Sequence, residues 1–153
     1  MAGETERHNL VVLNVAFFLR GAAGGLACRV VAENVKLHIA ASNKIYYHDV
    51  MVLCDAADDH PSIKRQPCFI AEVLSPTTEA TDRREKLEAY RTIPGLATYA
   101  IVSPERRYVE VHHRSDGAWK AIVLEDQGAV EIPCLGTRIT FDMIYEGVGS
   151  RPG

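Results

Sequence analysis

Two short apolar runs in the middle of the chain place the strongest constraint on its fold. They are residues 49–54 (DVMVLC) and 68–74 (CFIAEVL), and polar or proline-bearing segments bound each of them. A strand with one solvated face alternates apolar and polar residues, so short continuous runs are typical of central strands that are covered on both faces. The sequence therefore predicts a sheet with buried central strands.

The N-terminal segments predict a helix followed by strands. Residues 8–20 are apolar around most of a helical circumference and end at a glycine cluster, which indicates a largely buried helix with a glycine stop. Residues 27–32 and 34–39 are strand-like, and we expect them to form a hairpin-like pair. Residues 55–67 are polar and contain two prolines, which predicts a surface loop.

The C-terminal half predicts a second helix and further strands. Residues 79–91 form a charged amphipathic helix that follows hydroxyl and proline capping residues. Turn signals then separate three strand-like segments, which predicts an antiparallel meander of residues 98–103, 108–114 and 119–124. The pattern is that of an α/β protein with a central mixed sheet flanked by helices. We expect one domain over residues 1–147 and a flexible tail at 148–153.

Composition limits the classes of function. The chain has 153 residues, a formal net charge of −3 and a pI of about 6.1, which opposes strong electrostatic binding to long nucleic acid. Contact with DNA is therefore expected to be local and weak. The longest apolar run, residues 10–19, is interrupted by Asn14 and is shorter than the ~20 residues of a membrane span. With no secretory leader recognised, the expected location is the cytoplasm.

The four cysteines show no CxxC spacing that would indicate a zinc site. Cys54 and Cys68 stand in apolar runs, where a thiol behaves as a small hydrophobic side chain. The sequence therefore predicts buried thiols rather than metal ligands.

Two acids stand in or beside the central strands. Glu72 interrupts an apolar run and Asp49 begins the other. A buried carboxylate is costly unless it is paired or bound to a metal ion, and side chains on neighbouring strands approach within ~5 Å. One interpretation is a structural ion pair or a strand end near solvent. The other is a pair of oxygen ligands for Mg²⁺ or Mn²⁺, the ions of phosphodiester chemistry.

Lys86 lies on the second predicted helix, one face of which it shares with Asp82 and Tyr90 by three- and four-residue spacing. A solvated face with salt bridges among Asp82, Arg83 and Lys86 would explain the same pattern. The spacing alone does not decide between that arrangement and a catalytic lysine.

Three segments in this order resemble the motif series of the Uma-two family, restriction-endonuclease-like proteins of the PD-(D/E)XK nuclease superfamily. They are residues 47–52 (YHDVMV), 71–79 (AEVLSPTTE) and 82–90, the last beginning DRREKL. The similarity extends from His8 to residues 144–146. The resemblance implies a restriction-endonuclease-like fold and a Mg²⁺ or Mn²⁺ site.

The resemblance also implies roles for individual residues. Asp49 and Glu72 would hold the metal ion, and Lys86 would complete the catalytic set with them. His8, Arg83 and Tyr90 would contact substrate. Two positions depart from the pattern: His48 replaces the proline before the aspartate, and Leu74 replaces the superfamily's lysine two residues after the glutamate. Residues i and i+2 of a strand share a face, so Leu74 points toward the site without charge.

The function implied is a metal-dependent DNA endonuclease, and a homodimer would suit cleavage of two strands. The alternative is a nuclease-fold module with a binding or structural role and no cleavage, which the low pI and Leu74 favour slightly. Hydrolysis of another phosphodiester or of a nucleotide is a third hypothesis.

Overall fold

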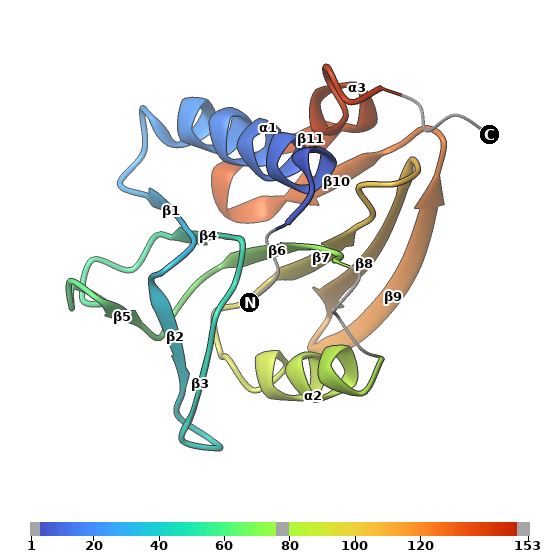
Figure 1. Ribbon diagram of the computed structural model, residues 1–153. Coiled ribbons are helices and arrows are strands. Elements are labelled where there is room, and N and C mark those ends of the chain that lie inside the picture. Colours follow the sequence, from blue (N-terminus) through green and yellow to red (C-terminus); the bar gives the residue numbers. More distant parts are fainter. Residues whose placement is uncertain (1–3, 76–79, 150–153) are drawn as a thin grey trace.

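The computed structural model describes residues 4–75 and 80–149, with the backbone alone for 80–82. A six-stranded sheet runs through the molecule in the order β1-β4-β6-β7-β8-β9 (Figure 1). Its strands are Arg29–Ala32 (β1), Val50–Leu53 (β4), Phe69–Val73 (β6), Thr98–Val102 (β7), Tyr108–Ser115 (β8) and Ala118–Glu125 (β9). β6 and β7 are parallel and the other neighbours are antiparallel. The predicted mixed sheet is therefore confirmed.

The central strands are covered on both faces, as the apolar runs predict. Every residue of β4, β6 and β7 is buried. The helix α2, Ala80–Tyr90, lies in the connection between β6 and β7. Parallel neighbours need a crossover of this kind, because a tight turn joins only antiparallel strands. The predicted helix 79–91 is present within the described residues, whereas 76–79 lie outside them.

Helices cover opposite faces of the sheet (Figure 1). α1, Glu6–Ala23, buries one stripe of side chains at helical spacing, and its exposed side carries Leu13 and Phe17. The hairpin of β10 (Ala129–Ile132) and β11 (Thr137–Thr140), with the short helices η1 (Pro133–Leu135) and α3 (Phe141–Ile144), joins the core on that face. On the other face, Tyr90 of α2 packs with Met51 and Ile70 of the sheet.

The predicted hairpin between residues 27–32 and 34–39 is wrong. β1 pairs with β4, whereas β2 (Lys36–Ile39) belongs to a separate three-stranded sheet with β3 (Lys44–Tyr46) and β5 (Ile63–Lys64). Asn34, at φ 67°, occupies the turn between β1 and β2. This turn directs β2 away, so that Leu37 and Ile39 enter the core beside α2. The loop predicted at 55–67 contains β5 near its end.

The predicted C-terminal meander is confirmed by the antiparallel pairing of β7, β8 and β9. Asp116 and Gly117, at φ 52° and 79°, form the two-residue turn between β8 and β9. Positive φ at both positions is the geometry whose twist suits a tight hairpin, and glycine adopts it without strain. In the predicted tail, Val148 packs against the core and Gly149 accepts a hydrogen bond from Arg7, whereas 150–153 lie outside the described residues.

The cysteines form disulfides, which the sequence analysis did not predict. Cys28, just before β1, is bonded to Cys54, just after β4. Cys68, just before β6, is bonded to Cys134 of η1. Because the partners are 26 and 66 residues apart, their pairing depends on the sheet order and leaves no local signature in the sequence.

Within the part of the chain that the structure describes, no helix combines the length and the apolar character that crossing a membrane requires.

Candidate active site

An open pocket of about 210 Å³ lies where β4 begins and β6 ends. Asp49 directly precedes β4, and Glu72 is the fourth residue of β6. Both line the pocket together with Lys86 of α2, His8 of α1 and Ser75. Three segments far apart in the sequence thus bring the predicted carboxylates and the lysine to one opening.

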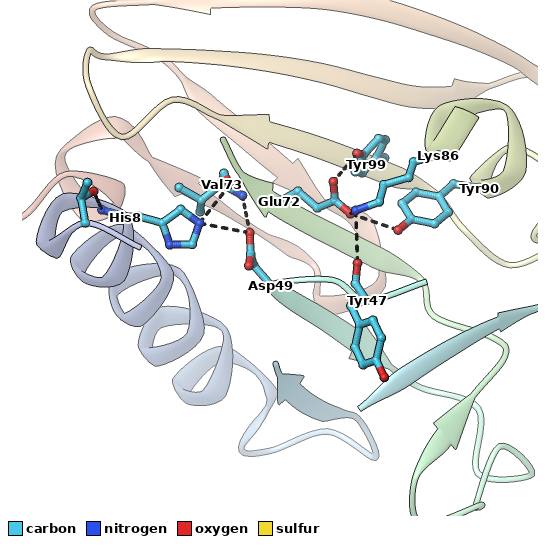
Figure 2. Close-up of polar contacts among 9 residues, drawn as sticks. His8, Tyr47, Asp49, Glu72, Val73, Lys86, Tyr90 and Tyr99 are labelled. Atoms are coloured by element: carbon cyan, nitrogen blue, oxygen red, sulfur yellow. Dashed lines mark hydrogen bonds and ion pairs between the residues drawn. The ribbon is translucent and has the colours of Figure 1, made fainter. Parts of the chain in front are cut away.

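The Glu72 carboxylate accepts hydrogen bonds from three side chains of this site (Figure 2). Its Oε1 accepts hydrogen bonds from the Lys86 Nζ at 3.2 Å and from the Tyr90 hydroxyl at 3.0 Å, and its Oε2 accepts one from the Tyr99 hydroxyl at 2.8 Å. The residue is only 7% exposed. Three donors, one of them cationic, offset the cost of burying its charge.

Lys86 holds two segments together. Besides Glu72, its Nζ donates to the carbonyl oxygen of Tyr47 at 3.3 Å, which ties α2 to the chain just before Asp49. The Lys86 side chain is 18% exposed. It therefore lines the pocket, whereas the Asp82 side chain of the alternative salt bridge lies outside the described residues.

Asp49 faces the other helix (Figure 2). Its Oδ2 accepts a hydrogen bond from the Val73 backbone N–H at 2.7 Å and lies 3.7 Å from the Nε2 of His8. Burial raises the pKa of the Asp49 carboxyl above its ordinary value; the Val73 amide and His8 oppose this rise, whereas the charge of Glu72 adds to it. The neighbouring protein groups thus compensate the negative charge of an ionised Asp49 only in part.

His8 is positioned by the start of α1. The Thr5 hydroxyl caps the helix by accepting from the His8 N–H at 3.2 Å, and the His8 Nε2 lies 3.1 Å from the Val73 carbonyl oxygen. An imidazole that donates from Nε2 to this carbonyl presents the same N–H edge toward Asp49. His8 therefore anchors α1 to the end of β6 beside the acid.

His48, which replaces the family's proline, is a buried residue of the pocket wall. Its Nε2 lies 2.9 Å from the Val35 carbonyl oxygen. Burial lowers the pKa of His48 from 6.5 to about 4, the nearby Lys86 charge also lowers it, and the Val35 carbonyl opposes the change. The ring is consequently neutral near pH 7 and donates its Nε2 proton to that carbonyl.

The two carboxylates share the pocket but diverge within it. Glu72 turns toward Tyr90 of α2 and Tyr99 of β7, whereas Asp49 turns toward α1 (Figure 2). Among the described residues, no third histidine, cysteine or acid joins this pair in a group whose ligand atoms all lie within 4.8 Å. The candidate donor set for a metal ion is accordingly two carboxylates.

This donor set fits Mg²⁺ or Mn²⁺ in kind. A carboxylate has about four acceptor sites, of which the described hydrogen bonds occupy three on Glu72 and one on Asp49. Mg²⁺ is commonly held by one or two carboxylates, with water and substrate phosphate as the other ligands. Both side chains therefore retain an oxygen lone pair for such an ion.

The remaining predicted residues occupy different positions. Tyr90 is fully buried and contacts Tyr99 edge to face, with ring centroids 4.9 Å apart, so it lies behind Glu72. Arg83 is partly buried and is not among the described residues that line the pocket. Leu74 lines the pocket and packs on the α2 side of the sheet, the face that Glu72 occupies.

Sequence reasoning missed Tyr99. This fully buried tyrosine of β7 supplies the shortest hydrogen bond to Glu72. Its only signal in the sequence is a hydroxyl within an apolar run, since a buried tyrosine needs a polar partner. The sequence does not identify Glu72 as that partner, because the contact depends on the parallel register of β6 and β7. This register places Tyr99 opposite Ile70, two residues before Glu72.

The model of one protein family, described as "Putative restriction endonuclease", matches residues 1–143. The chain belongs to the Uma2 family. This confirms the resemblance that the three sequence segments indicated, and it supports a nuclease-type function. Residues 49, 72 and 86 all fall inside the matched region.

Two curated proteins of Synechocystis sp. are relatives of this chain. The "Uncharacterized protein slr1290" is 28% identical over 97% of this chain and 79% of its own length. The "Uncharacterized protein sll1609" is 30% identical over 84% of this chain and 73% of its own length.

The fold is similar to a solved structure from Anabaena variabilis, described as a putative nuclease belonging to DUF820. The TM-score is 0.75, and the match covers 94% of this chain and 83% of that chain at 12% identity. At this identity the likeness establishes a shared fold, and the chemistry must be argued from the site.

Proposed function

We propose that this Uma2 protein is a divalent-metal-dependent DNA endonuclease whose metal ligands are Asp49 and Glu72. The observation that carries the proposal is the shared pocket: two acids from neighbouring strands and the Lys86 amine meet at one opening. Membership of a family described as "Putative restriction endonuclease" supports a nuclease-type reaction. A bound Mg²⁺ or Mn²⁺ would supply an activated water and neutralise phosphate charge.

Other residues of the chain would orient the Glu72 carboxylate and stabilise negative charge in the pocket. Lys86 holds Glu72 by a 3.2 Å contact and carries positive charge into the pocket, where a phosphate or a developing negative charge would be stabilised. Tyr90 and Tyr99 fix the Glu72 carboxylate from behind. For Tyr90, this support suits a fully buried side chain better than direct contact with substrate.

The raised pKa of Asp49 fits a site that gains by binding a cation. Burial and the Glu72 charge make the ionised form of Asp49 costly. A divalent cation would reduce that cost, because a nearby opposite charge favours the ionised form of a carboxylate. The ion would thus supply the positive charge that stabilises ionised Asp49 and that the protein alone does not fully provide.

The test is nicking of supercoiled plasmid DNA in Mg²⁺ or Mn²⁺. Wild-type protein is expected to relax the plasmid, and Asp49→Asn, Glu72→Gln and Lys86→Ala are each expected to lose this activity. Removal of the ions with a chelator should abolish it reversibly. Nicking that persists in all three variants would refute the assignment.

Matched controls separate loss of the site from general loss of charge. Glu88→Gln removes an exposed acid from α2, and Asp59→Asn removes one from the loop after β4. Lys44→Ala removes a half-exposed lysine that pairs with Glu85. All three controls are expected to nick DNA at the wild-type rate.

A binding or structural module without cleavage is the second candidate. Leu74 leaves the superfamily's lysine position uncharged, and the Lys86 amine is engaged by Glu72. This alternative predicts that wild-type protein binds DNA or a divalent ion, or neither, without nicking under any ionic condition. The plasmid assay therefore decides between the two functions.

A further inference from the structure

The four cysteines gather at one end of three neighbouring strands. Cys28 precedes β1, Cys54 follows β4 and Cys68 precedes β6, and these strands are adjacent in the sheet. Cys134 reaches the same place from η1. Antiparallel pairing brings the start of one strand beside the end of its neighbour, which explains why residues so distant in sequence converge.

The two disulfides touch each other. The Sγ atoms of Cys54 and Cys68, which belong to different disulfides, lie 3.6 Å apart. The Sγ atoms of Cys54, Cys68 and Cys134 all lie within 4.8 Å of one another. Cys28 is bonded directly to Cys54, so the fourth sulfur joins the same cluster.

The separation between Cys54 and Cys68 is close to the spacing of thiolates around a tetrahedral ion. Zinc–sulfur bonds of about 2.3 Å place the sulfurs of a tetrahedral site about 3.8 Å apart. The 3.6 Å contact is close to that value, and reduction would let each sulfur move away from its disulfide partner to a similar distance. The cluster is also partly to fully buried against the core under α1, as expected for a closed structural site rather than a catalytic one.

We propose that, when reduced, Cys28, Cys54, Cys68 and Cys134 form a four-thiolate site for one thiophilic divalent ion such as Zn²⁺, and that the two disulfides are the oxidised form of this site. A dithiol reductant would give two electrons and two protons to each disulfide and become a disulfide itself. The ion then displaces one proton from each of the four thiols. This site is separate from the carboxylate pocket, and its ligands are sulfur atoms rather than carboxylate oxygens.

The expected difference between the redox forms is measurable with Co²⁺ as a spectroscopic substitute for zinc. The intact chain is reduced with dithiothreitol without oxygen, freed of the reductant, and checked for four titratable thiols. We expect thiolate-to-cobalt charge-transfer absorption that saturates at one thiolate-bound Co²⁺ per chain and is abolished when Zn²⁺ displaces that ion. The oxidised chain should show no such absorption, because disulfide sulfurs are not thiolates.

Variants define the ligands and keep this test apart from the nuclease proposal. Cys54→Ser and Cys68→Ser should lose the four-thiolate spectrum and its saturation at one Co²⁺ per chain. The double variant Asp49→Asn, Glu72→Gln should retain both, whatever its effect on nicking. The thiolate spectrum thus reports on the cysteine cluster alone.

Metal-linked stability provides a second measurement. An ion that binds the folded form raises its melting temperature, and a reduced chain that has unfolded should regain its circular dichroism on adding Zn²⁺. Fully reduced wild-type protein that takes up neither Co²⁺ nor Zn²⁺ would overturn the proposal. So would bound Co²⁺ without thiolate absorption, or an identical spectrum from the oxidised chain.

Discussion

Replacing His48 with glutamine should remove an acid sensitivity that this residue builds into the fold. The ring is 4% exposed, and its pKa is lowered from 6.5 to about 4 chiefly by burial. The unfolded chain takes up the proton near pH 6.5, whereas the folded chain resists it until about pH 4. The stability that depends on neutral His48 is therefore present above pH 6.5 and is lost as the pH falls toward 4.

The size of this loss follows from the two pKa values. Each pKa unit corresponds to about 1.4 kcal/mol, so His48 alone lowers the free energy of unfolding by about 3 kcal/mol between pH 7 and pH 4. In His48→Gln, the side-chain amide can still donate to the Val35 carbonyl but does not titrate. The variant should thus lose about 3 kcal/mol less than wild type over that range.

Urea denaturation at constant ionic strength, in steps from pH 7 to pH 4, measures this difference directly. Carboxylates that titrate in the same range contribute equally to both proteins and cancel. His113→Gln, at a partly exposed histidine of β8, serves as the control and should follow the wild-type curve. Parallel curves for wild type and His48→Gln would refute the reasoning.

Two further predictions concern the carboxylates. Asp49→Asn is expected to raise the melting temperature at neutral pH without divalent ions, because burial raises the pKa of Asp49 and the charged form is costly. This gain should vanish below about pH 4, where the acid is protonated in both folded and unfolded chains; a variant that is less stable at neutral pH would contradict it. Tyr99→Phe removes a hydrogen bond to buried Glu72 and should lower the free energy of unfolding in urea by about 1.5–3 kcal/mol. Tyr47→Phe, at an exposed ring, should change it by less than about 0.5 kcal/mol, and equal effects of the two would argue against the role of Tyr99.

The sequence predicted the elements better than their pairing. The apolar runs identified β4 and β6, because burial on both faces leaves a signature within each strand. The partner of β1 was predicted wrongly. Chain proximity favoured β2, whereas the fold gives β1 a fully buried neighbour in β4 and sends β2 to another sheet. Pairing between distant strands depends on the whole arrangement and has no local mark.

For the candidate site, too, the sequence predicted individual residues better than the contacts between them. Motif order was enough to name Asp49, Glu72 and Lys86, and the structure brings all three to one pocket. Their roles in metal binding and catalysis remain predictions. The support of Glu72 by Tyr99 was not foreseen, because it depends on the register between parallel strands.

The cysteines were the largest gap between sequence and structure. Their spacing lacks any metal-binding motif, and two of them resembled buried thiols in apolar strands. Only the sheet order β1-β4-β6 brings three of them together with Cys134. Spacing motifs detect sites built from one or two local segments, and this cluster draws on four.

Calorimetric titration of Mn²⁺ into the oxidised protein tests the central claim most directly, since oxidation keeps the cysteines out of the measurement. We expect one Mn²⁺ per chain with millimolar or tighter affinity for wild type, and no binding heat for Asp49→Asn or Glu72→Gln. Wild-type protein that takes up no ion, or variants that bind it as wild type does, would contradict the assignment of these two acids as its ligands.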